Sequence, residues 1–311
     1  MIVEARHLAI PTRRNLLLVV LVTTTMAALL FLASRVEGWW LALVAVAFAM
    51  IALTNYALMH EASHRTLHPW PWLNDALGAI TGMFFPTSAT LMRVTHEVHH
   101  RCNRTDHEMF DVYYQGDHLL LKRAQWYSIL TGLFYLVIPL GAFFVGFARP
   151  LLLTRPFKHS RSSGVLFDDF DAGTLWRVRS EALLLVVVWG TLLGSGVLHW
   201  LPTLILFAAA GINWSSRQYV THAWSPRRIA DGAHNLATSR LHQALLLNGN
   251  WDVVHHLAPA VPWIHLPELG RQSRPPIPYL GQWLSLWRGP RLATEPGPVL
   301  PERPQPAVLA V

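Results

Sequence analysis

The chain has 311 residues, a formal charge of +7 and a single cysteine, Cys102. Apolar residues make up 52% of it and charged residues only 14%, against roughly 25% in an average soluble domain, which indicates a membrane protein. One cysteine excludes an intrachain disulfide and argues against a Cys-based zinc or iron–sulfur site. No basic stripe stands apart from the apolar segments, so a nucleic-acid partner is not expected.

Two apolar runs follow a short polar stretch, residues 1–14, which we expect in the cytoplasm. The runs cover residues 15–34 and 39–59, and the turn between them is too short for anything but a helical hairpin. About 20 residues at 1.5 Å each cross a hydrocarbon core of about 30 Å. The alternative for residues 15–34 is a cleavable signal peptide, but the run is long for one and the second run follows at once.

The next two apolar runs are interrupted by glycine and proline. Residues 76–91 are short for a span and fit a re-entrant or interfacial segment. The run 126–147 is predicted to enter and return, bending near Pro139–Gly141, because the loop 149–180 after it is basic and therefore cytoplasmic by the positive-inside rule. The alternative is a full span, which would place this basic loop outside.

A second hairpin is predicted from residues 181–200 and 203–221. Its return helix would deliver Gln218 and His222 to the cytoplasmic side, four residues apart on one face. Residues 223–287 would then form a cytoplasmic cap.

The predicted fold is therefore an all-α integral membrane protein with four transmembrane helices arranged as two hairpins. Re-entrant or interfacial segments and a cytoplasmic helical cap complete one membrane domain over residues 15–287. Residues 288–311 are rich in proline and lack apolar periodicity, which predicts a disordered tail. The localisation expected is multi-pass in a membrane, with the cap on the cytoplasmic face.

Histidines gather in three clusters that we expect on this same face. The clusters are His60 and His64; His96, His99 and His100; and His255 and His256, which follow Asp252. Positions i, i+3 and i+4 share one face of a helix, so the rings of a cluster point the same way. Imidazole is a usual ligand for zinc, copper, iron and nickel, and the histidines outnumber the needs of one tetrahedral zinc, which indicates two metal ions.

Three interpretations compete for these histidines. Surface side chains without metal are the plainest, but so many clustered histidines on one face argue against it. A metal transporter should hold its ligands near the bilayer midplane, whereas these lie just outside the predicted helix ends. The third is a redox enzyme with two metals at the membrane surface, acting on a substrate that arrives from the lipid.

The stretches H-E-A-S-H, H-E-V-H-H and N-W-D-V-V-H-H resemble the three histidine boxes of the membrane fatty acid desaturase and hydroxylase superfamily. The resemblance implies two iron ions, O2 as co-substrate, and electrons from an external ferredoxin or cytochrome-type donor with its reductase. It implies desaturation of a fatty acyl group carried on a lipid, CoA or acyl carrier protein. Hydroxylation or ketolation of a lipid or terpenoid is the alternative, because one fold hosts several reactions. Non-catalytic metal binding or transport is the alternative from a different class.

The resemblance also implies roles for single residues. The box ligands would be His60, His64, His96, His99, His100, His255 and His256. His222 resembles an extra ligand at the end of the last helix, and Gln218 stands where the family has an Asn that can hold a water at the metal. The third box usually begins with histidine, but Asp252 stands there. Its carboxylate can replace an imidazole as iron ligand, or it can turn away or orient His255.

Imidazoles that bind metal through one nitrogen need an acceptor for the N–H of the other. Carboxylates close to the boxes in sequence are candidates, among them Glu97 and Asp106, with Glu61, Glu108 and Asp231 as others. A solvated or structural role is the alternative for each.

Overall fold

The computed structural model describes residues 8–154, 165 and 169–300. Among these the protein is mostly helical and has no closed sheet, which confirms the mostly helical class. The strands of the described part are two residues long and form two parallel pairs: β1 (Val112–Tyr113) with β4 (Arg291–Leu292), and β2 (Leu236–Ala237) with β3 (Ile277–Pro278).

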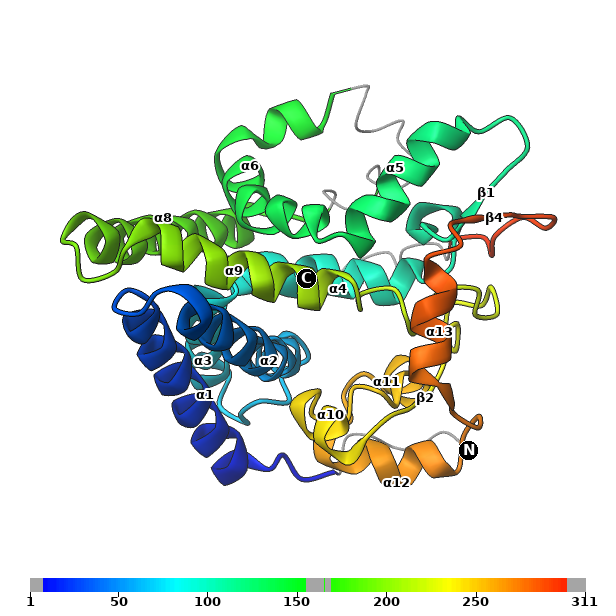
Figure 1. Ribbon diagram of the computed structural model, residues 1–311. Coiled ribbons are helices and arrows are strands. Elements are labelled where there is room, and N and C mark those ends of the chain that lie inside the picture. The colour runs from blue at the N-terminus through cyan, green and yellow to red at the C-terminus, as the bar shows by residue number, and fades with distance from the viewer. Residues whose placement is uncertain (1–7, 155–164, 166–168, 301–311) are drawn as a thin grey trace, which may run out of the picture.

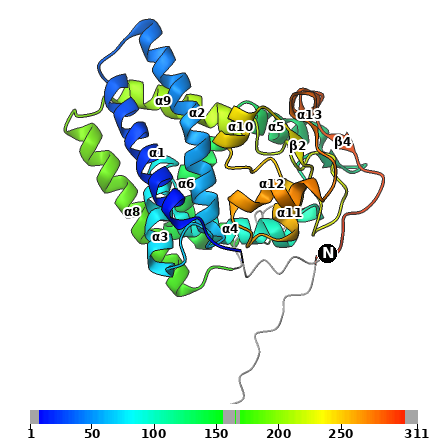
Figure 2. The same ribbon diagram turned by 90° about the horizontal axis from the view of Figure 1, so that it is seen from below.

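Most of the long helices gather on one side of the molecule and the short C-terminal helices lie on the other (Figures 1 and 2). The longer helices are α1 (Thr12–Ala33), α2 (Gly38–Ser63), α3 (Pro71–Phe84), α4 (Ala89–Cys102), α5 (Leu119–Leu130), α6 (Val137–Leu152), α8 (Ala172–Gly194) and α9 (Trp200–Ser215). The shorter ones are α10 (Arg240–Leu245), α11 (Asp252–Leu257), α12 (Leu266–Arg271) and α13 (Tyr279–Leu286), with 3-10 turns η2 (Asp106–Glu108), η3 (Leu133–Leu136) and η4 (Trp263–His265).

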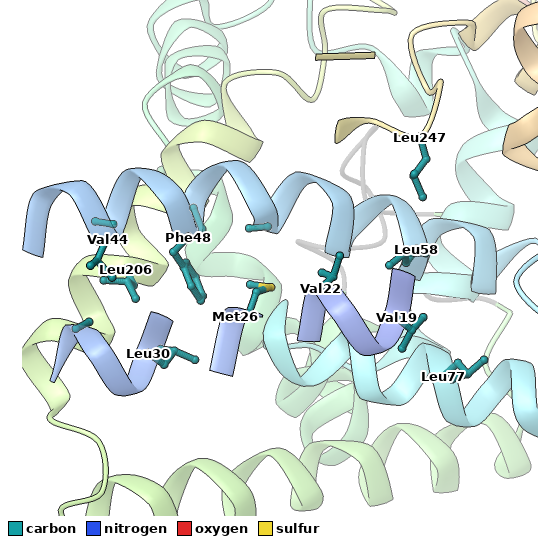
Figure 3. Close-up of a cluster of buried hydrophobic side chains, with 14 of the residues drawn as sticks. Val19, Val22, Met26, Leu30, Val44, Phe48, Leu58, Leu77, Leu206 and Leu247 are labelled. Atoms are coloured by element: carbon teal, nitrogen blue, oxygen red, sulfur yellow. The ribbon is translucent and has the colours of Figure 1, made fainter. Parts of the chain in front are cut away.

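Helix α2 is the centre of the fold, packing against α1, α3, α4 and α9. The main hydrophobic cluster lies between these helices, and Figure 3 shows Met26 of α1, Phe48 of α2 and Leu206 of α9 within it. These three side chains are completely buried. Because α2 ends at Ser63, this packing fixes where His60 and His64 lie.

The two hairpins turn at the same end of the molecule (Figure 1). The backbone N–H of His199, between α8 and α9, donates to the Ser34 hydroxyl, between α1 and α2, at 2.9 Å. The end of α9 lies beside the middle of α2, where the Asn213 amide donates to the Ala49 carbonyl at 2.8 Å.

Among the described residues, three stretches are long and apolar enough to cross a membrane: α1, α2, and residues Leu133–Leu152, which include η3 and α6. The predicted second hairpin is present as a helical pair with different bounds, since α8 begins at Ala172 and α9 ends at Ser215. Helix α9 is apolar, but its 16 residues reach only about 24 Å, short of a hydrocarbon core of about 30 Å.

The break in the run 126–147 lies at Gly132 and not at the predicted bend near Pro139–Gly141. Gly132 has φ +87°, and a Cβ there would lie 2.8 Å from Ile212 of α9, so glycine is required on both counts. Pro139 is the third residue of α6, where a missing N–H costs no helical hydrogen bond.

Three other segments also differ from their predicted form. Residues 76–91 are divided between α3 and the start of α4. Gln218 and His222 lie in turns after α9, not on its last helical turn. Of the basic loop 149–180, the part with Arg155, Lys158 and Arg161 lies outside the described residues.

Both ends of the described chain contact the rest of the protein. Within the tail predicted from residue 288, β4 pairs with β1, and residues 301–311 lie outside the described part. Near the other end, the completely buried Asn15 of α1 donates to the Leu67 carbonyl at 2.8 Å and accepts from the Trp263 indole at 2.9 Å. These bonds join α1 to the cap.

Candidate metal centre

The structure brings the three histidine clusters together in two groups. The first consists of His60, His64, His96 and His255, each of which offers one ring nitrogen within 4.8 Å of the others. Its rings come from the last turn of α2, the C-cap of α2, the middle of α4 and α11. The ring centroids of His60 and His96 are 4.4 Å apart, and those of His60 and His255 are 4.5 Å apart.

The second group consists of His99, His222 and His256, whose ring nitrogens obey the same 4.8 Å limit. His222 and His256 are buried. Asp252 lies beside them, with Oδ2 3.4 Å from Nε2 of His222 and 3.8 Å from Nε2 of His256. Asp252, which stands where the third box usually has a histidine, therefore faces this group.

His100 lies between the two groups. Its Nε2 is 3.1 Å from Nε2 of His96 and 3.0 Å from Nε2 of His255. Its ring is also 4.5 Å from the ring of His256, centroid to centroid. All nine predicted ligand positions thus lie in one continuous cluster.

The electrostatics keep most of these imidazoles neutral. Burial, with neighbouring imidazoles, lowers the pKa values of His96, His100, His255 and His256, and burial likewise lowers that of His222. A neutral imidazole has a free lone pair, which is the form that binds metal.

The pKa values of His99, a member of the second group, and of its neighbour Asp252 are shifted upward. Burial opposes protonation of His99, but the Glu108 carboxylate, 3.5 Å from Nδ1, outweighs it and raises the pKa of His99. Burial raises the pKa of Asp252 to about 6. Two carboxylates, Glu108 and Asp252, therefore lie beside the second group.

The acceptors and neighbours that hold the rings come from loops. The carbonyl of Gly232 lies 3.1 Å from Nδ1 of His222, and the Asn103 amide lies 3.3 Å from Nδ1 of His256. Neither was among the predicted candidates. Asn103 is the C-cap of α4, directly after the second box, and that position is the signal that could have found it.

The predicted neighbours lie elsewhere. Asp106 accepts from the Tyr114 hydroxyl and from Arg227, both at 2.7 Å, because η2 directs it away from the rings. Glu97 is an exposed residue of α4. Gln218 lines the same cavity as His222. Of the carboxylates predicted to accept an imidazole N–H, Glu108 is the one that lies near a histidine of the second group, His99.

Helix α4, which carries three of the histidines, is anchored at both ends. At its start Ser88 accepts from the Leu91 N–H, and Glu181 of α8 accepts from Ser88 Oγ at 2.5 Å and Thr90 N at 3.0 Å. A carboxylate at a helix N-terminus also compensates the helix dipole.

At the other end of α4, Arg104 and Asp111 form an ion pair at 2.8 Å, with exposed fractions of 1% and 0%. Asp111 Oδ2 also accepts from the Trp224 N–H at 2.6 Å. The pair therefore connects the segment after His100 to the segment after His222. Arg104 itself has φ +61°, a left-handed conformation stabilised by this network.

A cavity of about 570 Å³ borders both groups. Its histidine-lined part is formed by His60, His96, His99, His222, His255 and His256. The remaining wall is largely apolar, with Phe134, Ile138 and Val145 from η3 and α6 at one side and Leu246 and Leu247 from the cap at another. An apolar chain therefore matches its lining.

The residues present fit metal ions of the iron or zinc type. Seven ring nitrogens fall into two close groups, and the buried Nε2 of His64 has no hydrogen-bond partner within the described part of the chain. A buried polar atom without a partner is costly, so a ligand that it could bind accounts for its position. Nitrogen donors with one carboxylate suit a divalent transition metal.

The profile of the family described as Fatty acid desaturase matches residues 37–286. No curated protein matches the chain. The matched residues include every histidine of both groups.

Proposed function

Since the chain belongs to the fatty acid desaturase family, we propose that it is a membrane oxidoreductase that uses two iron ions and O2 to desaturate a fatty acyl group. The family is membrane-bound and known to use iron, and oxidises fatty acyl chains. The observation that carries the proposal is the division of the ring nitrogens into two groups beside one apolar cavity.

In this proposal His60, His64, His96 and His255 hold one iron. His99, His222, His256 and Asp252 hold the other, and His100, which approaches both groups, completes one of them. Bound iron would supply the oxidising power to remove hydrogen from an unactivated C–H bond when O2 and electrons are provided.

The protein's own contribution is binding, orientation and exclusion of water. The apolar wall from α6 and the cap would hold an extended chain against the histidines and replace its contacts with water. The Gly232 carbonyl would fix the tautomer of His222, and Asn103 would fix the orientation of His256.

The proposal is tested with the purified full chain. We expect two iron ions per chain by elemental analysis, and an acyl product with one added double bond by mass spectrometry, formed only with O2 and a reductant. A hydroxylated or ketonised product would favour the alternative reaction at the same centre. Metal other than iron, or metal flux through vesicles without any product, would contradict the proposal.

Replacing Asp252 tests whether its carboxylate is a ligand. We expect Asp252→Ala to lose iron from the second group and, as for loss of any direct ligand, to lower activity by more than about a hundredfold, while Asp252→His keeps most of the iron because imidazole replaces the carboxylate. Iron content and turnover are measured together. Unchanged iron and turnover in Asp252→Ala would show that the carboxylate does not bind metal.

Electron donor and orientation belong to the same proposal. An external ferredoxin or cytochrome-type protein would deliver electrons, and the basic charge expected on the cap side would attract an acidic donor. The positive-inside rule would place this side in the cytoplasm. If the association rate of the donor protein with this chain did not change with ionic strength, the proposed electrostatic attraction between them would be contradicted.

A further inference from the structure

A second cavity of about 540 Å³ lies next to the first, and Arg217 and Tyr279 line both. It lies between α2, α9 and α13, and Trp283 of α13 joins the end of α9 through a bond to the Ser216 carbonyl at 3.1 Å. Figure 1 shows α13 beside this end of α9. The pair Arg217 and Tyr279 is therefore the boundary between an outer groove and the histidine-lined cavity.

The outer groove is apolar and open toward the outside. Val46 of α2, Ile212 of α9 and Leu280 of α13 line it and are 61%, 54% and 64% exposed. Val46 lies on α2, a stretch long and apolar enough to cross a membrane, and large exposed apolar residues on such a helix are expected to contact lipid. A lipid-soluble molecule can therefore reach Arg217 from the bilayer without crossing water.

Arg217 is partly buried and has only neutral partners. Its Nε donates to Asn213 Oδ1 at 2.9 Å, and one terminal nitrogen contacts His242 Nε2 and the Tyr279 hydroxyl, both at 2.7 Å. Burial, with the Arg217 charge, lowers the pKa of His242 to about 4, so this ring is neutral at neutral pH.

No carboxylate forms an ion pair with Arg217 within the described residues. A guanidinium in a partly apolar setting is costly without an anion. The chain thus leaves a positive charge uncompensated at the boundary of the two cavities.

We propose, resting on the function proposed above, that Arg217 binds the anionic oxygen group at the head of the acyl substrate and so positions the chain in the histidine-lined cavity. Arg is suited to this because its planar fork matches carboxylate and phosphate oxygens. Tyr279 holds the guanidinium at the boundary.

The charge count favours a head with a single negative charge. Arg217 is the one Arg or Lys among the described residues that line either cavity, whereas Glu61, Glu108 and Asp252 line the inner one. A head with several phosphates, such as CoA, would find one cation here. A carboxylate or a phosphodiester carries one charge and matches it.

Binding measurements on the purified full chain test this without needing turnover. Two matched pairs are compared by displacement of radiolabelled palmitate: palmitate against methyl palmitate, and phosphatidylglycerol against diacylglycerol with the same acyl chains. The wild type should prefer the anion of at least one pair by about tenfold or more, as a charge-assisted hydrogen bond implies. A preference for palmitate over methyl palmitate alone would identify the substrate as a free fatty acid. A preference for phosphatidylglycerol over diacylglycerol alone would identify it as a phospholipid.

In Arg217→Gln the preference should fall to about one, because the charge is gone, while binding of the neutral member stays unchanged. Arg217→Lys should show part of the wild-type preference for the anion, because the positive charge is kept. Tyr279→Phe leaves the Arg217 charge in place and should keep most of the preference for the anion. Arg35→Gln is the matched control, because Arg35 lies at the outer turn of the first hairpin and lines neither cavity.

Iron content checks that each variant is folded. The inference is overturned if the wild type shows no preference in either pair, or if Arg217→Gln keeps the wild-type preference. Because binding is measured, an absence of oxidised product would count against the proposed function alone and would leave this result intact.

Discussion

We expect His60→Ala and His222→Ala each to remove one of the two iron ions and to lower activity by more than about a hundredfold. Changes in groups that only orient metal ligands cost about 10- to 100-fold, so loss of a direct ligand should cost at least as much. The two variants report on different groups, since His60 belongs to the first and His222 to the second. Elemental analysis and turnover under O2 are the measurements.

His265→Ala is the control for both, because His265 lies outside the two groups and contacts the Ala9 carbonyl. It should keep both irons and full activity. Wild-type iron content in either ligand variant would contradict the assignment of that group. One iron per chain in the wild type, lost in His60→Ala and kept in His222→Ala, would indicate a single metal site.

Replacing Asp111 with Ala should destabilise the fold by about 3–5 kcal/mol, the usual cost of leaving one member of a buried ion pair without its partner. Arg104 would remain buried with its charge, and the Trp224 N–H would lose its acceptor. Because these bonds connect the segments after His100 and His222, iron content should fall with stability. The measurement is the free energy of unfolding in detergent, followed together with iron release.

Arg177→Ala is the matched control for this variant. Arg177 also pairs with an aspartate, Asp75, at 3.1 Å, but its side chain is 61% exposed. Exposed pairs contribute below about 1 kcal/mol, so this variant should stay near wild-type stability. A loss for Asp111→Ala no larger than for Arg177→Ala would show that the buried pair is not what holds the second group.

Sequence reasoning could predict the histidine site because its information is local. His96, His99 and His100 follow helical spacing, and helical spacing alone directs the rings of one cluster to one side. The order of the boxes and the resemblance then indicated that they converge. The structure brings all of them together, with Asp252 next to His222.

The contacts around the rings could not be predicted in the same way. Gly232 acts through its backbone carbonyl, which has no sequence signature, and its approach to His222 depends on a loop. Asn103 reaches His256 across 153 residues of chain. Asp106 was plausible by nearness in sequence, but nearness in sequence does not determine the direction of a side chain in a 3-10 turn.

The same limit explains the displaced break in the run 126–147. Proline and glycine at Pro139 and Gly141 are common signs of a bend, yet both are accommodated inside α6. The break at Gly132 is imposed by Ile212, which lies 80 positions later in the sequence and touches this turn through tertiary packing. A residue's own type cannot reveal that neighbour.

The bond between Asn15 and Trp263 has a consequence for the order of folding during synthesis. Trp263 is made 248 residues after Asn15, so α1 must insert with an amide oxygen whose donor does not yet exist. An unsatisfied amide in lipid is costly, and a contact of such long range forms slowly. The bond that joins α1 to the cap can therefore form only after Trp263 has been translated, and the metal groups, which include His255 and His256 of the same late segment, can be complete only after that segment has been made.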